Sequence, residues 1–173
     1  MQMVKKIIGG FFLLLIFLVI FAPKQQIYYL LEKELAKNDI VISNEKFSDN
    51  LLGLSISDAD IYVKGIKMAH IKSVDLDIFL LYNKLTIDSV HTDKGIQNIV
   101  PKSIDKLSAT FSIIKPYKVA IDGVGSFGEV KGGFYLNMNK IFLRLPKTKD
   151  ISTFRKFLQK DKEGLYYEKF FGK

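Results

Sequence analysis

The sequence predicts a mainly β protein: a twisted antiparallel β-meander curled into a groove or sandwich, with an N-terminal transmembrane helix and short amphipathic helices on its flanks. Three observations indicate this fold class. One uncharged run stands near the N-terminus, apolar and polar residues alternate from Ile40 onwards, and Gly, Asn, Asp or Pro separates the alternating runs. Alternation with a period of two is typical of strands that bury one face. The intervening segments contain no helical pattern for parallel crossovers.

Residues 1–23 are predicted to form a cytoplasmic tip and a transmembrane signal anchor. Residues 7–22 read IIGGFFLLLIFLVIFA and are uncharged, between Lys5-Lys6 and Pro23-Lys24. Sixteen helical residues span roughly 24 Å, enough to cross a thin bilayer. Under the positive-inside rule the lysine doublet stays in the cytoplasm. The bulk of the chain then lies in the periplasm of a bacterium, behind a single pass through the inner membrane.

A cleaved signal peptide is the alternative interpretation of the same run. Signal peptides end in a small-x-small cleavage site. Here Ile20, Phe21 and Ala22 precede Pro23, so the first small position is occupied by a large residue. The pattern favours an uncleaved anchor.

Residues 24–39 form a second predicted unit, an amphipathic helix next to the membrane. Ile27, Leu31 and Leu35 recur at helical spacing, and Asn38-Asp39 end the pattern. We expect this apolar stripe to pack on the following domain; a position on the membrane surface is the alternative.

Residues 40–146 are the predicted antiparallel β domain. In residues 52–63 the apolar positions change from even to odd numbers, which predicts a bulge at Asp58. Turns are expected at Lys64-Gly65 and at residues 82–84. The expected strands cover residues 41–42, 52–63, 71–80, 85–90, 107–113, 117–121, 130–138 and 141–145.

Residues 147–173 are the predicted C-terminal helix and aromatic tail. Asp150 or Ser152 can cap a helix that places Phe154, Phe157 and Leu158 on one side. The segment GLYYEKFF that follows either pairs as a last strand or covers an open end of the sheet.

The residue types restrict the chemistry of this protein. The chain has no Cys and only two His, His70 and His91, which excludes disulfides, thiol nucleophiles and Cys-ligated or His-rich metal sites. Residues 123–128 match G-x-G-x-x-G, but strand alternation follows them where a dinucleotide site needs a helix. We interpret these glycines as a turn in a closely packed strand.

Carboxylates in the β domain are predicted to lie on a solvated face. They alternate with apolar residues, so we do not interpret them as an acid–base or metal pair. We expect no enzymatic activity, no cofactor and no metal. The carboxylates concerned are Asp58, Asp60, Asp75, Asp77 and Asp88.

The charge balance favours membrane partners over nucleic acid. The net charge is +8, and without Lys5 and Lys6 a diffuse +6 remains. Each basic residue close to an anionic lipid surface contributes about 1 kcal/mol of attraction. Inner-membrane lipids are the expected partner, and nucleic acid is not.

Several segments together resemble a known family. After the anchor come the helix IYYLLEKELAK, the strand IVISNEKFS and the run GLSISDADIYVKGIKMAHIKSVDLDIFLLYNKLTIDSVHTD, an order that resembles the start of AsmA-like envelope proteins. The late segment GEVKGGFYLNMNKIFLRLP and the total length are most similar to the N protein of type II secretion systems (GspN). This resemblance implies an open, curled antiparallel sheet that can carry lipids on its concave face.

The resemblance also implies candidate site residues and partners. A non-enzymatic component of a secretion or cell-envelope assembly, bound to other envelope proteins, is the first expected function. A lipid-handling protein that holds acyl chains is the alternative, as in AsmA-like or lipopolysaccharide-transport proteins. The chain lacks the long middle and C-terminal sheet of the large family members. The positions expected to face lipid are Leu54, Ile56, Ile61, Val74, Leu76, Ile78, Leu85, Ile87, Phe111 and Ile113.

Overall fold

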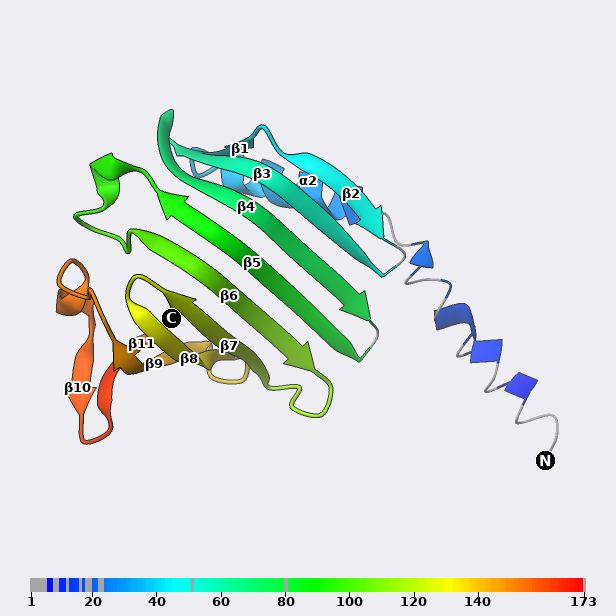
Figure 1. The fold of residues 1–173 in the computed structure, drawn as a ribbon. Coiled ribbons are helices and arrows are strands. Elements are labelled where there is room, and N and C mark those ends of the chain that lie inside the picture. Colours follow the sequence, from blue (N-terminus) through cyan, green and yellow to red (C-terminus); the bar gives the residue numbers. More distant parts are fainter. Residues whose placement is uncertain are drawn as a thin grey trace.

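The computed structural model shows one curled antiparallel sheet and one helix that packs on it (Figure 1). It describes residues 6–7, 10–11, 13–15, 17, 20–21, 24–50, 52–79 and 81–172. Within these residues eleven strands form a single sheet. The expectation of a mainly β antiparallel meander is therefore confirmed.

The elements follow one another in a simple order. Helix α2 spans Lys24–Ala36, and the 3₁₀ turns η1 and η2 span Lys94–Ile96 and Arg155–Phe157. The strands are β1 (Ile40–Ser43), β2 (Lys46–Asn50), β3 (Gly53–Val63), β4 (Ile66–Phe79), β5 (Tyr82–Thr92), β6 (Ser103–Ser112), β7 (Lys118–Gly125), β8 (Gly128–Tyr135), β9 (Lys140–Thr148), β10 (Gln159–Asp161) and β11 (Gly164–Phe170).

Strands that are consecutive in the chain are mostly neighbours in the sheet. From β3 to β9 every strand pairs with the next. At one edge both β1 and β2 pair with β3, and at the other edge β11 lies between β9 and β10. Short connections permit this pairing because antiparallel strands need only a turn between them.

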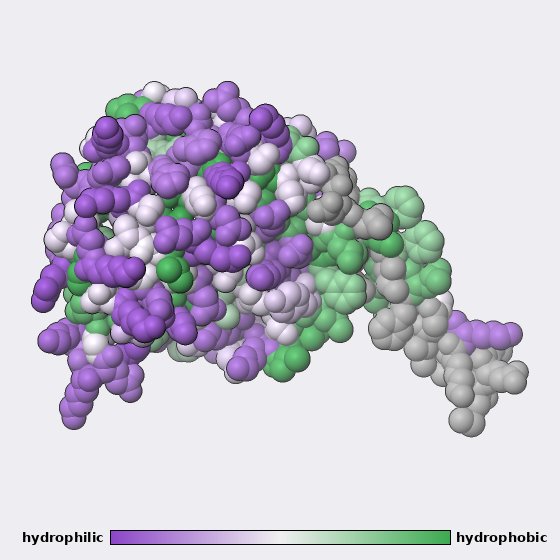
Figure 2. All heavy atoms as spheres, in the orientation of Figure 1, coloured by the Kyte–Doolittle hydropathy of each residue, from purple (hydrophilic) through white to green (hydrophobic). Residues whose placement is uncertain are grey.

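The two faces of the sheet differ in chemistry. In Figure 1 the sheet curls so that β9 and β11 lie behind β6 to β8, and α2 lies behind β3. The face toward the viewer is mostly hydrophilic in Figure 2. Residues that point outward form ion pairs across strands, such as Arg144, whose Nη1 and Nη2 donate to the two carboxylate oxygens of Asp161 at 2.9 and 2.8 Å. The apolar side chains therefore occupy the concave inner face.

In four neighbouring strands the residues that point inward change between even-numbered and odd-numbered positions, and the change occurs at the same height in the sheet. In β3 the inward residues change from Leu54 and Ile56 to Ala59 and Ile61. The strand pairing is the same before and after this level, since Ser57 pairs with Ser73 and Ala59 with Ile71. β4, β5 and β6 each change phase at the matching level. The residues at these changes are Asp58, Lys72, Ser89 and Asp105.

These four residues form a row across the sheet, which we call the insertion row. Two of them have left-handed backbone conformations, Asp58 with φ of 58° and Ser89 with φ of 52°. One additional residue in each strand at the same level leaves the strand register intact and keeps both halves of each strand facing inward. The phase change that the sequence indicated at Asp58 is present and belongs to this row, but it is not a bulge of one strand, because the register shift between β3 and β4 lies between Ile61 and Tyr62.

The glycine motif of residues 123–128 forms the hairpin between β7 and β8. Gly125 pairs with Gly128, and Gly128 has a φ of 104°, which favours glycine. A Cβ at Gly128 would stand 2.0 Å from the Lys147 carbonyl oxygen. The motif is a tight turn against β9, as the sequence indicated.

The N-terminal segment is described only in part. The predicted anchor over 7–22 includes residues 8–9, 12, 16, 18–19 and 22, which lie outside the described residues. Among those that are described, no helix combines the length and the apolar character needed to cross a bilayer.

The predicted C-terminal helix is wrong. After Asp150 the chain makes only the 3₁₀ turn η2 and the short strand β10, and the aromatic tail then pairs as strand β11. Phe154 and Leu158 pack on a second apolar cluster that contains Phe127, Val130 and Leu145. Only residues 151–158 lie between Asp150 and β10, and a helix of that length is marginal in water, so the packing of Phe154 and Leu158 on the cluster decides their conformation.

Several strand boundaries also differ from expectation. β4 and β6 begin earlier than expected, at Ile66 and Ser103. Residues 82–84 belong to β5, so the expected turn lies earlier. Leu136 and Met138 follow β8 and lie in a turn. Strand β2 was not expected as a separate strand, because its residues, KFSDN, lack apolar alternation.

We expect the effect of the insertion row on the fold to depend on how many residues each strand contains, more than on which side chains stand in the row. Deletion of Ser89 turns one half of β5 over and exposes its apolar residues, so the full chain should lose most of its cooperative unfolding transition. Ser89→Gly fits the left-handed backbone and should unfold within about 0.5 kcal/mol of the original chain. Urea unfolding in mild detergent measures both. A deletion as stable as Ser89→Gly would contradict the role of the row.

Candidate functional site

An apolar groove lies between α2 and the inner face of β3, β4 and β5. It has a volume of about 390 Å³, within the range of roughly 300–1,000 Å³ that is typical of small-molecule sites. Its lining residues are Lys24, Tyr28 and Leu31 of α2, Ile42 of β1, and Leu54, Ile56, Ala59, Ile61, Ile71, Val74, Leu76, Ile78, Leu85 and Ile87. We call this the α2 groove.

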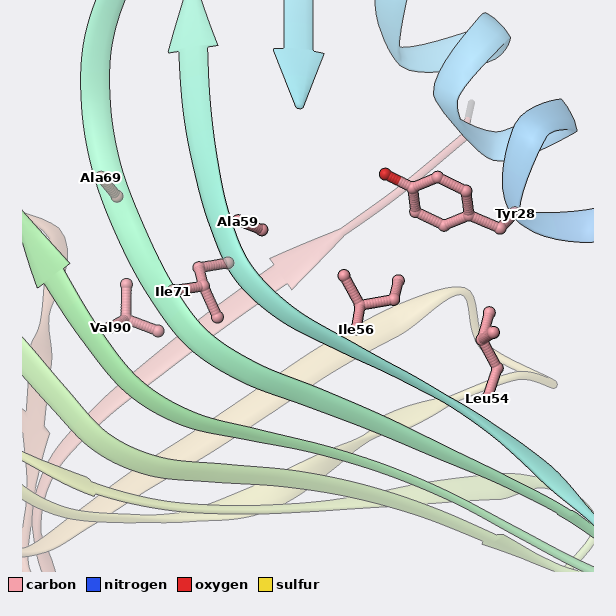
Figure 3. Packing of buried hydrophobic residues seen from close by; sticks show 7 residues of the cluster. All are labelled: Tyr28, Leu54, Ile56, Ala59, Ala69, Ile71 and Val90. Atoms are coloured by element: carbon pink, nitrogen blue, oxygen red, sulfur yellow. The ribbon is translucent and has the colours of Figure 1, made fainter. Parts of the chain in front are cut away.

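Tyr28 holds α2 on the sheet. Only 6% of this residue is exposed, and Figure 3 shows its ring directed from α2 toward Ala59 and Ile56 on β3. The ring also meets Phe47 edge to face, with 4.7 Å between the ring centroids. The Tyr28 hydroxyl donates to Glu45 at 3.3 Å. Burial, reinforced by the Glu45 charge, raises the pKa of Tyr28, so the phenol stays a neutral donor.

The amphipathic helix packs on the domain, although not through the whole stripe that the sequence indicated. Leu31 lines the groove but is 54% exposed, and Leu30 points away with 68% of its surface exposed. Nothing is described of the Ile27 side chain. The contact with the sheet runs through Lys24, Tyr28 and Leu31, spaced by four and three residues.

The groove wall is apolar and incompletely covered. Leu76, Ile78 and Leu85 are only half-buried, although they point to the inner side of the sheet. The most buried hydrophobic residues of the described chain, Ala59 and Leu54, still expose 3% and 4%. Inward-facing apolar surface thus stays accessible.

Eight of the ten residues expected to face lipid come together in this groove, from Leu54 on β3 to Ile87 on β5. Phe111 and Ile113 do not line it. Phe111 pairs with Asn83 and Val119 farther along the sheet, and Ile113 follows the end of β6 and is 53% exposed. That lipid occupies these positions stays a prediction.

The sequence interpretation missed part of the lining. Ala59 and Ile71 lie beyond the insertion row, where simple alternation no longer applies. One signal for this was available in the sequence. Ile71 stands three residues before Val74, so the apolar positions change phase there as they do at Asp58. The contributions of Lys24 and Tyr28 depend on how α2 docks, which no local pattern specifies.

Lys24 is the charged member of this lining as the structure describes it. The residue is 8% exposed, and its side chain borders the groove at the first turn of α2.

Asp60 lies on the opposite face of the sheet and differs from the predicted solvated carboxylates. It is 8% exposed, and its side chain accepts from Asn44 Nδ2 at 3.0 Å. Lys67 Nζ and His70 Nδ1 each lie 2.8 Å from Asp60 Oδ1. Hydrogen bonds from Lys67, then His70 and Asn44, lower the pKa of Asp60 to about 2.

The other carboxylates of this set follow the expectation more closely. Asp58 and Asp77 are exposed, and Asp75 and Asp88 are half-buried. Lys46 Nζ donates to Asp58 at 2.9 Å and lowers the pKa of that carboxyl. Within the described part of the chain, no three His, Asp or Glu side chains are grouped so that they could hold a metal ion.

The fold and the groove define this chain as a single-sheet antiparallel β protein with an apolar groove under one helix. No family model, curated protein or solved structure matches the chain.

We expect Tyr28 to account for much of the docking energy of α2. Tyr28→Ala removes a buried aromatic ring and should lower the free energy of unfolding by about 3 kcal/mol. Tyr29→Ala, at the neighbouring position that is 52% exposed, should cost less than about 1 kcal/mol. Chemical unfolding of the full chain in mild detergent measures the difference. Equal losses in the two variants would show that Tyr28 does not anchor the helix.

Asp60 should make stability depend on pH in the acid range. Its folded-state pKa of about 2 lies below the ordinary value of 3.8, so its contribution is complete above pH 4 and disappears as the pH falls through 2. Asp60→Asn should therefore unfold at lower urea concentration than the original chain at pH 7, and the gap should close toward pH 2. Asp77→Asn, an exposed residue on the same face, is the matched control. A gap of constant size from pH 7 to pH 2 would contradict this assignment.

Proposed function

We propose that this chain is a non-enzymatic, membrane-anchored protein that holds the acyl chain of an anionic lipid or fatty acid in the α2 groove. The observation that carries the proposal is the accessible apolar wall beneath α2. This wall runs across three strands, and no carboxylate is among its described lining residues.

The dimensions of the wall suit a single acyl chain. Along β4 the lining residues extend from Ile71 to Ile78, a length of about 23 Å for a strand. Each methylene group moved from water to such a wall contributes about 0.8 kcal/mol. Several methylenes therefore outweigh the entropy that the chain loses on binding.

Lys24 supports an anionic head group on the ligand. It is the first residue of α2, and it lines the groove together with Ile78 and Leu54. A carboxylate or phosphate next to this ammonium group is stabilised by charge, whereas a neutral alcohol is not. The proposed ligand class is an acyl chain with an anionic end.

The proposed topology has the N-terminus in the cytoplasm, one pass through the bacterial inner membrane and the sheet in the periplasm. The uncharged run over 7–22 and the preceding Lys5-Lys6 doublet support this arrangement. Inner-membrane lipids are then the source of the ligand.

A second candidate function is a component of a type II secretion or cell-envelope assembly, as the resemblance to the AsmA-like and GspN families suggests. One feature of the sheet edge favours it. β10 pairs with residues 164–166 of β11, so residues 167–170 have no partner strand on that side among the described residues. An open edge of this kind can accept a strand from another protein.

Photolabelling of the full chain in liposomes tests the proposed function. The probe is a palmitate that carries a photoreactive diazirine, and labelled residues are located by mass spectrometry. We expect labels at residues 74–78 and 85–87. Leu76→Gln places a polar group in the wall and should reduce this labelling about tenfold, which corresponds to about 1.4 kcal/mol.

Asp77→Gln is the matched control, because it places the same side chain one residue away on the opposite face. It should label as the original chain does. Lys24→Gln should weaken labelling by the palmitate probe and leave labelling by the corresponding fatty alcohol unchanged. If these groove residues take no label and the chain co-purifies with secretion-system proteins, the lipid proposal fails and the second candidate is favoured.

A further inference from the structure

Exposed apolar side chains gather at one end of the sheet. They come from the connections β2–β3, β4–β5, β6–β7 and β8–β9 and from the end of β11, which share one end because the strands are antiparallel. We call Leu52, Leu81, Ile114, Met138 and Phe170, one residue from each segment, the apolar rim. Ile114 is 85% exposed and Phe170 is 63% exposed.

The two ends of the sheet differ in charge. The rim connections, residues 51–52, 80–81, 113–117 and 136–139, contain Lys115 but no Asp or Glu. The connections at the opposite end contain the carboxylates Asp93, Asp150 and Glu163 together with seven basic residues. Exposed apolar residues such as Ile99 also occur there, next to these charged residues. The rim connections differ in having apolar tips without carboxylates, not in a larger positive charge.

The helix that follows the N-terminal apolar run in the chain begins at the rim end. The backbone N–H of Lys64, in the β3–β4 turn at the opposite end, donates to the Asp39 carbonyl at 2.8 Å, which places the end of the α2 segment there. α2 therefore starts at the rim end, as the path of the chain in Figure 1 shows. In Figure 2 hydrophobic residues gather on this side of the molecule.

Two exposed tyrosines accompany the rim. Tyr82 is 45% exposed and Tyr117 is 50% exposed, next to the β4–β5 and β6–β7 connections. Tyrosine is enriched at the interface between lipid and water, where its ring is apolar and its hydroxyl is hydrated. Apolar tips, tyrosines and a lysine without carboxylates are the composition of a surface that enters anionic lipid.

We infer that the apolar rim inserts into the interfacial layer of an anionic lipid bilayer, the same bilayer that holds the N-terminal run. The sheet then stands on the membrane with Leu81, Ile114 and Met138 among the upper acyl carbons. Lys115 faces the phosphates. This inference rests on the proposed membrane anchoring but not on acyl binding in the groove.

Tryptophan fluorescence of the full chain tests the inference, because the natural sequence contains no Trp. Ile114→Trp reports on the rim, and Ile99→Trp, an isoleucine that is 58% exposed at the opposite end, is the matched control. Both variants are reconstituted in phosphatidylethanolamine–phosphatidylglycerol vesicles whose acyl chains carry bromine as a quencher. We expect blue-shifted emission and several-fold stronger quenching for Ile114→Trp than for Ile99→Trp.

A third variant separates failure of the inference from failure of the anchoring proposal. Leu13→Trp reports on the N-terminal run. Quenching of Leu13→Trp together with water-like emission of Ile114→Trp would overturn the rim inference and leave the anchor intact. Absence of quenching in both variants would overturn both. If Ile114→Trp is shielded but not quenched by the brominated lipid, the rim contacts a protein or a second copy, and the inference is wrong.

Discussion

The insertion row is the constraint on which the inner face of this protein depends. Side chains alternate along a strand, so one additional residue in a single strand would turn half of its apolar residues toward water. Here β3, β4, β5 and β6 change phase together, and their pairing continues unchanged. Figure 3 shows β3 and β4 curving at this level, with Ala59 and Ile71 on the inner side. The sheet bends there and keeps a continuous apolar face.

Helix α2 converts this curved face into a groove. Tyr28 fills the space above Ala59 and Ile56, while Leu76, Ile78 and Leu85 stay only half-buried farther along the same face. Apolar surface left accessible in this way lowers the stability that burial would otherwise provide. A ligand that covers this apolar surface would restore the lost stability, and the proposed acyl chain would do so.

The two faces and the two ends of the sheet carry different kinds of residues. The outer face is stabilised by polar contacts, and Asp60, which pairs with Lys67 and Asn44, is the most buried carboxylate among the ion pairs of the described residues. The end with the apolar rim carries positive charge alone in its connections, and Lys24 begins α2 at that end. The α2 groove and the rim thus share the end of the sheet where α2 begins. A lipid proposed to enter from the membrane would meet Lys24 first.

The sequence by itself determined the mainly β class, a helix within residues 24–39, the turn in the glycine motif and eight positions of the groove wall. These follow from periodicity and turn residues, which act over a few neighbouring residues. Only the tertiary structure decided that the phase changes at Asp58 and Ser89 lie in one row, that Tyr28 holds α2, and that the tail forms β11. Each of these depends on contacts between segments distant in the chain, and local periodicity does not record such contacts.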